Sequence, residues 1–357
     1  MSGPITFVVP GDVDDPEVAS GGNVYDLRMC EHLPARYVPV PGGWPMADPV
    51  ARANLAESLA VLPDGALVVV DGLVACGWPE IIGPAAKRLR LAVLVHMPLA
   101  DETGLDPVVA AELDTREWVT LRAAGAVVAT SPWAARRLVE HHGLDPDRVH
   151  TVAPGTDRAR LARGSDGRSQ LLCVAAVTPH KGQDLLVEAL ASVADLPWTC
   201  LCVGPLRRNP PFADRVRGLI DEYGLADRVA LAGPRSGPAL ETSYAHADLV
   251  VLPSRAETYG MVVAEALMRG IPVLATAAGA VPDTLGAASD GSVPGILVPA
   301  RDPVALGEGL RHWLTEPGLP DTLRVSARRR RKDLRGWADA AAELSAVLAA
   351  LESTWVA

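Results

Sequence analysis

Short apolar runs rich in β-branched residues alternate with segments of helical periodicity along the whole 357-residue sequence. This alternation is typical of a parallel α/β sheet, in which a helix follows each strand and returns the chain to the same edge. The predicted strands are 5–9, 66–70, 91–95, 126–129 and 149–152 in the first half, and 171–177, 199–203, 229–232, 249–252, 272–275 and 295–298 in the second. The chain is long for one ordinary domain, so we expect two Rossmann-like α/β domains.

The two halves are separated by a segment in which both periodicities lapse. It begins with Ala153-Pro154-Gly155-Thr156-Asp157 and continues through the polar residues 158–168. Pro, Gly and polar residues in such a cluster indicate a loop, here a hinge between domains. We therefore predict a first domain over 1–157 and a second over 168–337. An Ala/Leu-rich helix at about 338–357 is expected to return to the first domain.

Composition limits the class of protein. The net charge of −10 disfavours nucleic acid and anionic membrane surfaces as partners, and the basic run 328–332 is more typical of a solvated helix face. No apolar stretch approaches the ~18 residues of a membrane span, and five acids precede the first basic residue, Arg28, unlike a signal peptide. Five cysteines without a CxxC pair argue against disulfides and zinc. We expect a cytoplasmic protein without a cofactor.

The loops after the predicted strands carry most of the Gly, Pro and polar residues. Ligands of open parallel sheets bind beyond the carboxyl ends of strands, where helix N-termini and loop amides gather. The segments found there are Gly21-Gly22-Asn23, His96, Pro179 to Gly182, Gly233-Pro234-Arg235 and Pro253 to Glu257. Two domains with such edges are expected to face each other across a cleft.

Glu257 and Glu265 flank the start of a predicted helix. Glu265 lies among apolar residues, where an unpaired carboxylate is costly, so it requires a partner. Two interpretations remain open, an ion pair with a buried arginine or acceptance of both ribose hydroxyls of a nucleotide. Glu257 precedes the helix and is placed to meet a sugar, while the amides of residues 259–262 face a phosphate at the positive end of the helix dipole.

Lys181 stands out because only three of the 33 basic residues are lysine. A compact ammonium beside Gly182 suits one phosphate oxygen where an arginine fork does not fit, although a surface lysine is the alternative. His96 ends a buried strand and is either a ligand of a sugar hydroxyl or a satisfied core histidine. Gly21-Gly22 either admits a ligand close to the backbone or forms a plain tight turn.

Other chemistries find little support in the sequence. The remaining histidines, including His141-His142, have no ligand-like spacing with carboxylates, so no metal site is expected. No GxGxxG follows the first strand, which disfavours a nicotinamide dehydrogenase. No GxxxxGK[ST] is present, which excludes a Walker A site.

Several segments together resemble the family-four retaining glycosyltransferases. The strongest is Pro253-Ser254-Arg255-Ala256-Glu257-Thr258-Tyr259-Gly260 through Glu265, followed by Gly270-Ile271-Pro272-Val273 and the 278–283 loop. The glycine loop, His96, the 153–157 linker, the 179–182 loop and the closing helix extend the likeness over nearly the whole chain. This resemblance implies the GT-B fold and transfer of a hexosyl group from a UDP- or GDP-sugar, with retention and without a metal.

The same resemblance implies roles for individual residues. Glu265 is expected to hold the ribose, Lys181 to neutralise the diphosphate, and Gly22 to approach the diphosphate from the other domain. His96 is expected beside the transferred sugar. The full set of implied donor-binding residues is Gly21, Gly22, Lys181, Gly233, Arg235, Glu257, Thr258, Tyr259, Gly260, Met261, Val262 and Glu265, with Lys181, Glu257 and His96 as the catalytic ones.

Two departures from the family pattern bear on this expectation. Ala175-Ala176 stands where the family usually has Gly-Arg, so either Lys181 compensates or Arg235 or Arg255 substitutes. Gly279 is followed by alanine in place of a second glycine.

The acceptor is expected to be a small soluble molecule bound mainly by the first domain. Acidic and polar residues Asp12, Asn23, Asp101 and Glu102 are candidates to line that side. Two rival functions remain, a sugar-nucleotide epimerase of the same fold and a non-catalytic nucleotide-sugar binding protein. The missing arginine is the one feature that favours the latter.

Overall fold

The computed structural model describes residues 4–101, 105–166 and 168–355. The chain divides into two compact units. The first runs from the N-terminus to Asp14, from Gly21 to Gly155 and from Trp337 onward, and the second comprises Asp15–Ser20 and Thr156–Gly336. The chain thus passes from the first unit to the second just before Thr156, and the polar linker belongs to the second unit.

The first unit is built on a six-stranded parallel sheet in the order β2-β1-β3-β4-β5-β6. Its strands are β1 (Ile5–Pro10), β2 (Ala35–Val40), β3 (Leu67–Asp71), β4 (Arg90–Val95), β5 (Ala126–Ala129) and β6 (Val149–Thr151). The sequence missed only β2. This strand lies at the sheet edge and contains Arg36 and Pro39, which interrupt an apolar run but are tolerated where one side of the strand is unpaired.

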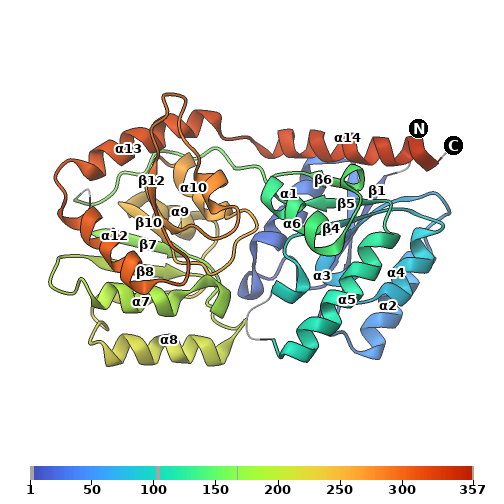
Figure 1. Cartoon of the computed structure of the whole chain (residues 1–357), viewed down its shortest axis with the longest axis horizontal. Helices are drawn as coiled ribbons and strands as arrows, with labels where there is room; N and C mark the ends of the chain where they lie inside the picture. Colours follow the sequence, from blue (N-terminus) through green and yellow to red (C-terminus); the bar gives the residue numbers. More distant parts are fainter. Residues whose placement is uncertain (1–3, 102–104, 167, 356–357) are drawn as a thin grey trace. The chain divides into compact units, whose positions relative to one another are not determined.

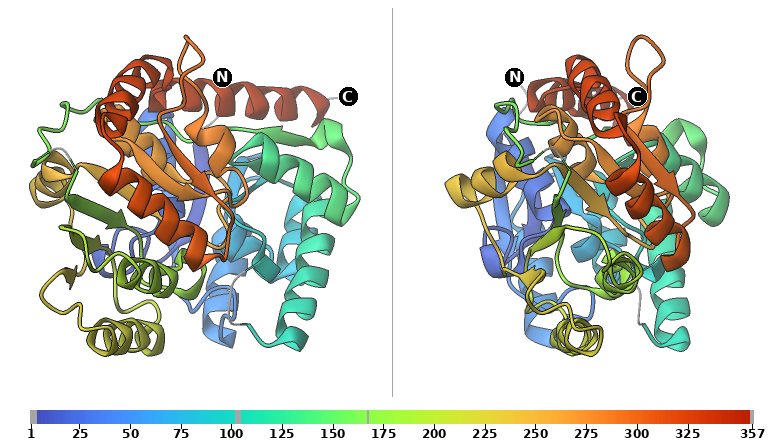
Figure 2. Two further views of the ribbon diagram at one scale, coloured as in Figure 1. Left: turned by 60° about the vertical axis from the view of Figure 1, so that its left-hand side comes forward. Right: turned by 90° about the vertical axis from the view of Figure 1, so that its left-hand side faces the viewer.

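Helices cover both faces of this sheet (Figures 1 and 2). They are α1 (Gly21–His32), α2 (Pro49–Ala60), α3 (Gly72–Ala75), α4 (Pro79–Ala86), α5 (Pro107–Ala123), α6 (Pro132–His142) and α14 (Trp337–Trp355), with 3-10 turns η2 (Leu99–Asp101) and η3 (Pro146–Arg148). The expected return of the C-terminal helix is confirmed, because α14 belongs to this unit and packs against α1. Tyr25 and Trp337 meet there edge to face, with ring centroids 5.8 Å apart.

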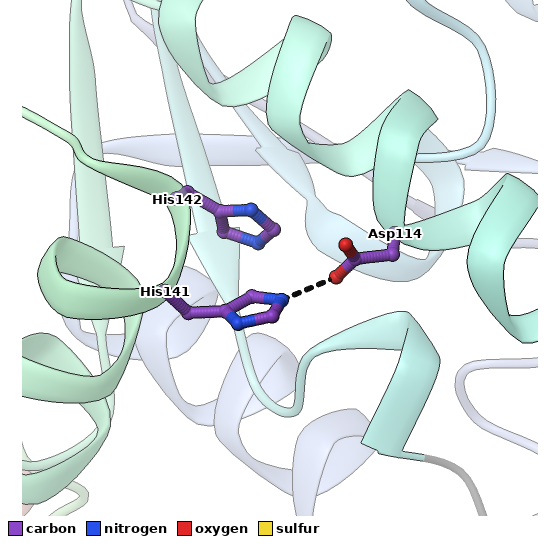
Figure 3. Close-up of side chains that lie close together, drawn as sticks. All are labelled: Asp114, His141 and His142. Atoms are coloured by element: carbon purple, nitrogen blue, oxygen red, sulfur yellow. Dashed lines mark hydrogen bonds and ion pairs between the residues drawn. The ribbon is translucent and has the colours of Figure 1, made fainter.

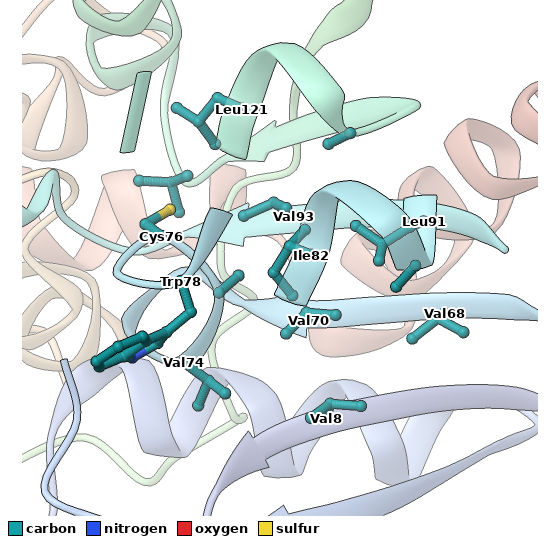
Figure 4. Packing of buried hydrophobic residues seen from close by; sticks show 14 of the residues in the cluster. Val8, Val68, Val70, Val74, Cys76, Trp78, Ile82, Leu91, Val93 and Leu121 are labelled. Atoms are coloured by element: carbon teal, nitrogen blue, oxygen red, sulfur yellow. The ribbon is translucent and has the colours of Figure 1, made fainter. Parts of the chain in front are cut away.

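Side chains of the strands alternate between the two faces. Val68 and Val70 of β3, with Leu91 and Val93 of β4, join the core shared with α2, α4 and α5 (Figure 4). Because successive side chains of a strand point to opposite faces, Val69 and Asp71 of β3 and Leu94 of β4 lie on the other face.

The second unit repeats this architecture with a sheet of order β12-β11-β10-β7-β8-β9, again parallel. Its strands are β7 (Gln170–Val174), β8 (Thr199–Val203), β9 (Val229–Leu231), β10 (Leu249–Leu252), β11 (Val273–Thr276) and β12 (Gly295–Val298). Its helices are α7 (Gln183–Ala191), α8 (Pro210–Glu222), α9 (Gly237–His246), α10 (Met261–Met268), α11 (Val281–Leu285), α12 (Pro303–Thr315) and α13 (Leu319–Arg330), with 3-10 turns η1 (Pro16–Val18), η4 (Pro179–Lys181) and η5 (Arg331–Asp333).

The basic run 328–332, which covers the end of α13 and the start of η5, is not simply the solvated face that its composition indicated. Arg329 pairs with Asp290. Arg330 Nε donates to the carbonyl of Leu285 at 3.2 Å, and Arg331 donates to the carbonyl of Ala159 at 2.6 Å. These arginines therefore fasten loops of the second unit. Among the helices of the described residues, none is both long and apolar enough to cross a membrane.

Candidate active site

In the second unit, Lys181 and Glu257 meet at the point where the strand order of the sheet reverses. From β7 the chain builds β8 and β9 on one side, then crosses to β10 on the other, so β7 and β10 are neighbours that lead their loops apart. Such a point is where open α/β sheets bind ligands. Lys181 follows β7 and Glu257 follows β10, and folding brings their side chains together.

Two glycines allow these loops to approach. Gly182 has φ +70°, and a Cβ there would lie 2.2 Å from the carbonyl oxygen of Pro253. Gly279 has φ +57°, and its Cβ would lie 2.0 Å from the carbonyl oxygen of Glu257. A side chain at either position would push the loops apart. Hence Gly182 allows the loop that carries Lys181 to pack against the loop that carries Glu257. Gly279 allows the following loop to pack against the Glu257 backbone.

The Lys181–Glu257 pair is close and partly shielded from water. Lys181 Nζ donates to Glu257 Oε1 at 2.6 Å, and Ser254 Oγ donates to the same oxygen at 2.7 Å. The Glu257 side chain is 8% exposed, while Lys181 keeps 24% exposure. Within the part of the chain that the structure describes, Glu257 is the polar partner of the ammonium group. A charge that is fixed in place yet accessible is suited to an anion.

Helix α10 begins immediately after this pair. Its first residue is Met261, preceded by Gly260 in the left-handed conformation with no side-chain cap. The amides of Met261 and Val262 therefore retain the donor capacity of an uncapped helix N-terminus, where anions are stabilised by the dipole. Thr258 and Tyr259 are half-buried in the preceding loop, and Thr284 Oγ1 donates to the Tyr259 carbonyl at 2.5 Å. The predicted phosphate-binding segment thus leads into an uncapped helix N-terminus, and its phosphate-binding role stays a prediction.

Glu265 lies one turn further along α10. Its carboxylate is hydrogen-bonded to a tyrosine and, across the described part of the chain, is not paired with an arginine. Its Oε2 accepts a hydrogen bond from Tyr244 Oη of α9 at 2.6 Å. Arg269 turns elsewhere, since its guanidinium donates to the Glu265 backbone carbonyl and pairs with Glu241. Oε1 makes no hydrogen bond within the described residues. Burial raises the pKa of Glu265, and the Tyr244 hydrogen bond opposes that shift.

Of the two arginines proposed to replace the charge lost at Ala176, Arg255 is engaged elsewhere, while Arg235 stays a prediction. Arg255 is committed, with both nitrogens 2.8 Å from the Asp184 carboxylate. Arg235 is exposed and donates to Ser243 Oγ at 2.9 Å, while Gly233 before it has φ +72° and is buried. Arg255 therefore holds its loop against Asp184 of α7. Arg235 is the more accessible cation of the two.

In the first unit, the direction change falls between β1 and β3, and a second group of polar side chains gathers there. Asp71 ends β3 and His96 follows β4, both on the face opposite the core containing Val70 and Val95. Helix α1 brings Asp26 onto them. His96 Nε2 lies 2.9 Å from Asp26 Oδ1 and 3.5 Å from Asp71 Oδ2.

This Asp26–Asp71–His96 cluster is buried, and its protonation is strongly perturbed. The Asp side chains are 1% and 5% exposed, against 18% for His96. Burial raises the pKa of Asp26 to about 7, while a hydrogen bond with Asp71 works in the opposite direction. Burial and the nearby Asp26 charge hold the pKa of Asp71 well above its usual range, and burial lowers that of His96. The two carboxyl groups are therefore able to hold a proton near neutral pH.

Gly22 contacts His96. A Cβ at Gly22 would lie 2.9 Å from His96 Cδ2, so the second glycine of the loop makes room for the imidazole, and Gly21 begins α1. Neither prediction for Gly22, a ligand contact or a plain turn, mentioned this. Both interpretations of His96, a ligand of a sugar hydroxyl and a satisfied core histidine, stay open. Its ring is hydrogen-bonded to Asp26 yet remains partly exposed.

The four acceptor candidates do not share one environment. Asn23 is buried in α1, whereas Asp12 is exposed. Asp101 is bound to Arg137, whose Nε donates to Oδ2 at 2.9 Å. Glu102 lies outside the described residues. Their role at an acceptor stays a prediction.

Sequence reasoning missed Asp26, Asp71 and Tyr244. Asp71 comes directly after the apolar run Val68-Val69-Val70, so the rule that found His96 also finds it. Asp26 and Tyr244 carry no such signal, because each is placed by how its helix packs against the sheet or a neighbouring helix.

Two clusters of the described residues bring ligand-type atoms within 4.8 Å of one another, Asp26–Asp71–His96 and Asp114–His141–His142. The histidine pair has no carboxylate at ligand-like spacing in the sequence, but the fold brings one to it. Asp114 is far from it in sequence, but α5 brings its Oδ1 to 2.6 Å from His141 Nε2.

Comparison with protein families gives two matches that together span most of the chain. The Glycosyltransferase Family 4 model matches residues 8–160, and the Glycosyl transferases group 1 model matches residues 157–330. The first match falls mainly on the first unit and the second on the second unit.

Two curated relatives are named as glycosyltransferases of D-inositol 3-phosphate. The chain is 34% identical over 250 residues to D-inositol 3-phosphate glycosyltransferase 1 of Catenulispora acidiphila, covering 65% of this chain and 58% of that protein. It is 32% identical over 230 residues to D-inositol 3-phosphate glycosyltransferase of Salinispora tropica, covering 58% and 47%. The matches thus span about half the length of these relatives.

Solved structures establish the fold. Sucrose-phosphate synthase from Thermosynechococcus elongatus superposes with a TM-score of 0.81 at 21% identity, over 99% of this chain and 100% of that one. HepE of Anabaena, solved with UDP and glucose, gives 0.73 at 17% identity, over 98% and 100%. The GT-B prediction is confirmed. With two parallel α/β units and family matches running from residue 8 to 330, this chain belongs to the family 4, group 1 glycosyltransferases.

Proposed function

We propose that this chain transfers a hexosyl group from a UDP- or GDP-sugar to a hydroxyl of a small soluble acceptor, with retention of configuration and without a metal. The main support for this proposal is the position of the Lys181 ammonium. It lies 2.6 Å from Glu257, which comes shortly before the uncapped N-terminus of α10. Cleavage of the sugar–phosphate bond leaves negative charge on the departing diphosphate. Oriented positive groups at that position lower the barrier.

Lys181 carries the diphosphate role in this proposal. Ala176 supplies no charge, and Arg255 is engaged with Asp184. The ammonium has three donors, of which one reaches Glu257, so the remaining protons are available to phosphate oxygens. Glu257 would then steady the lysine and accept from a sugar hydroxyl.

Glu265 holds the ribose in this proposal. Tyr244 bonds one carboxylate oxygen and orients the group, and the other oxygen has no partner within the described residues. A carboxylate oriented in this way accepts hydrogen bonds from vicinal hydroxyls, and bonds to a charged acceptor are worth about 1.5–3 kcal/mol.

The acceptor proposal draws on the relatives. Proteins at 32–34% identity are named D-inositol 3-phosphate glycosyltransferases, so a polyol phosphate is the first acceptor to test. His96 and its two aspartates are the groups we propose to act on the transferred sugar and the incoming hydroxyl.

A donor screen tests the proposal. In EDTA, thermal stability is measured with UDP, GDP and their hexose conjugates, and the stabilising donor is then incubated with D-inositol 3-phosphate, free inositol and other polyols. We expect selective stabilisation by one nucleotide and a glycoside whose anomeric configuration, read by NMR, equals that of the donor. Absence of any nucleotide effect refutes the donor assignment, and an inverted product refutes retention.

The same incubation separates the rival functions. An epimerase converts the donor without an acceptor, and a binding protein is stabilised by the donor but releases no nucleotide. Restoration of turnover only after addition of a divalent metal would refute metal independence.

A further inference from the structure

We propose that Asp114, His141 and His142 form a binding site for a divalent transition-metal ion between α5 and α6, with zinc as the reference ion. This site is separate from the donor chemistry and does not rest on the proposed function. Its basis is the convergence of two imidazoles and a carboxylate on one point (Figure 3).

The distances fit a metal after small adjustments. His141 Nε2 is 2.6 Å from Asp114 Oδ1, and the three ligand-type atoms all lie within 4.8 Å of one another. Ligand atoms of tetrahedral zinc lie about 2.0–2.2 Å from the metal, and so roughly 3.3–3.6 Å apart. The observed separations, from 2.6 Å to at most 4.8 Å, bracket that spacing.

Both histidines lie at the C-terminal end of α6. They are followed by Gly143 in the left-handed conformation, and their ring centroids are 4.7 Å apart with an interplanar angle of 65°. One ring is exposed and the other is buried. The exposed side, where His141 and Asp114 keep 43% and 34% exposure, provides a path for an ion from solvent.

A further carboxylate lies at the buried end of this cluster and holds His142 in place. Glu117, on α5 one turn after Asp114, is 0% exposed, and its Oε2 is 3.2 Å from His142 Nε2. Two imidazoles and the Asp114 carboxylate give a three-ligand set, which leaves the fourth position of a zinc ion to water. Glu117 also accepts from the amide of Leu99 through Oε1 at 3.3 Å. A metal here would therefore stiffen the segment that follows His96.

One cation, Arg137, lies beside the site, one turn before His141 on α6. Its bond to the Asp101 carboxylate through two nitrogens, and then the charges of Asp114 and Glu117, raise the pKa of Arg137. Asp101 offsets this arginine, and Asp114 and Glu117 supply negative charge for a divalent ion.

Metal titration of the full chain tests this site. After EDTA dialysis and removal of EDTA, zinc chloride is added in calorimetry and in thermal unfolding. We expect one zinc ion per chain, and a Tm increase on the order of 5 °C when free zinc is 100 times its Kd. Cobalt serves as a second probe, because its visible absorption reports four-coordinate geometry.

Substitutions locate the ion. His141→Ala and Asp114→Ala remove exposed groups, so the metal-free fold should persist, and each should weaken zinc binding by more than the ~10–100-fold cost of losing a secondary partner. His32→Ala is the matched control, since His32 is an exposed histidine whose ring bonds only a backbone carbonyl among the described contacts.

Three outcomes overturn the proposal. They are no saturable zinc binding, unchanged affinity in both His141→Ala and Asp114→Ala, or binding that survives in those variants and disappears in His96→Ala. The last result would assign the ion to the Asp26–Asp71–His96 cluster instead. Transfer activity in EDTA is read separately, so failure of this site leaves the proposed function untouched.

Discussion

The two units place acidic side chains at corresponding points of their sheets. The groups that surround these carboxylates differ between the units. In the second unit, Glu257 bonds Lys181 and Ser254, and Glu265 bonds Tyr244, so each carboxylate has a donor. In the first unit, Asp71 accepts from the amide of Leu73 at 2.5 Å, but Asp26 and Asp71 also meet each other and one imidazole. Asp26 Oδ2 is buried with no accepted hydrogen bond among the described residues.

This difference separates two kinds of chemistry. Carboxylates that bond a cation or a hydroxyl are oriented by it, which suits the proposed binding of a nucleotide and its phosphates. Burial raises the pKa of Asp26 to about 7 and holds that of Asp71 well above its usual range, so this cluster is able to hold and release a proton near neutrality. We therefore expect the second unit to bind anions and the first to exchange protons.

Loss of the Lys181 ammonium should give the largest effect. Lys181→Ala removes the fixed positive charge opposite the departing diphosphate, and we expect kcat to fall about 10²–10³-fold. Lys87→Ala, which removes an exposed lysine of the first unit, should leave kcat unchanged. Steady-state kinetics on the identified donor measure both, and a wild-type kcat in Lys181→Ala would remove this residue from the mechanism.

A double variant separates charge from folding. Lys181→Ala leaves Glu257 buried with Ser254 as its remaining donor, which costs stability. Adding Glu257→Gln removes the unpaired charge, so Tm should recover while activity stays low. Recovery of activity along with Tm would show that the lysine acts only on the fold.

The ribose carboxylate should give the next largest effect, on binding. Glu265→Ala removes the acceptor that Tyr244 orients, so nucleotide affinity should fall about 10–100-fold, the equivalent of 1.5–3 kcal/mol. Tyr244→Phe keeps the carboxylate and should cost less. Isothermal titration with the preferred nucleoside diphosphate measures both, and unchanged binding in Glu265→Ala would refute the assignment.

The proton-holding cluster predicts a pH dependence of stability. Asp26 has a folded pKa of about 7 against an ordinary value of 3.8, so folding takes up protons between these values. Its contribution is therefore full below about pH 4 and is lost as pH rises toward 7. Asp26→Asn should flatten that decline by at most about 1.4 kcal/mol per pH unit.

Urea midpoints at pH 5 and pH 8 measure this flattening. Asp12→Asn is the control, because Asp12 is exposed and its substitution should leave the pH dependence as it is. If stability changed with pH in the same way in wild type and Asp26→Asn, the expected proton exchange by the first unit would be refuted.

The sequence predicted the features that follow from strand periodicity. Lys181, Glu257 and His96 were found because each follows an apolar strand, and parallel strands deliver their ends to one edge. Strand β2 was missed because Arg36 and Pro39 break its apolar pattern at an edge. Whether Glu265 meets a tyrosine or an arginine depends on how α9 packs beside α10, which no local pattern encodes.

Contacts between distant helices set the same limit elsewhere. The Asp114–His141 pair joins α5 to α6, and Asp26 reaches Asp71 only through the docking of α1. Residue type and spacing identified the polar groups near strand ends, while packing chose their partners.

The smallest effect tests whether the position of His96, rather than its presence alone, matters in the first unit. Gly22→Ala gains up to about 1 kcal/mol of helix propensity in α1, but its Cβ would meet the imidazole at 2.9 Å. The ring must then shift away from Asp26, and we expect a several-fold loss of kcat with little change in Tm. In a His96→Ala background the obstacle is absent, so the same substitution should stabilise the fold and leave the residual activity unchanged. A double-mutant cycle should therefore show coupling of at least about 0.5 kcal/mol, and purely additive effects would mean that Gly22 does not act through the histidine.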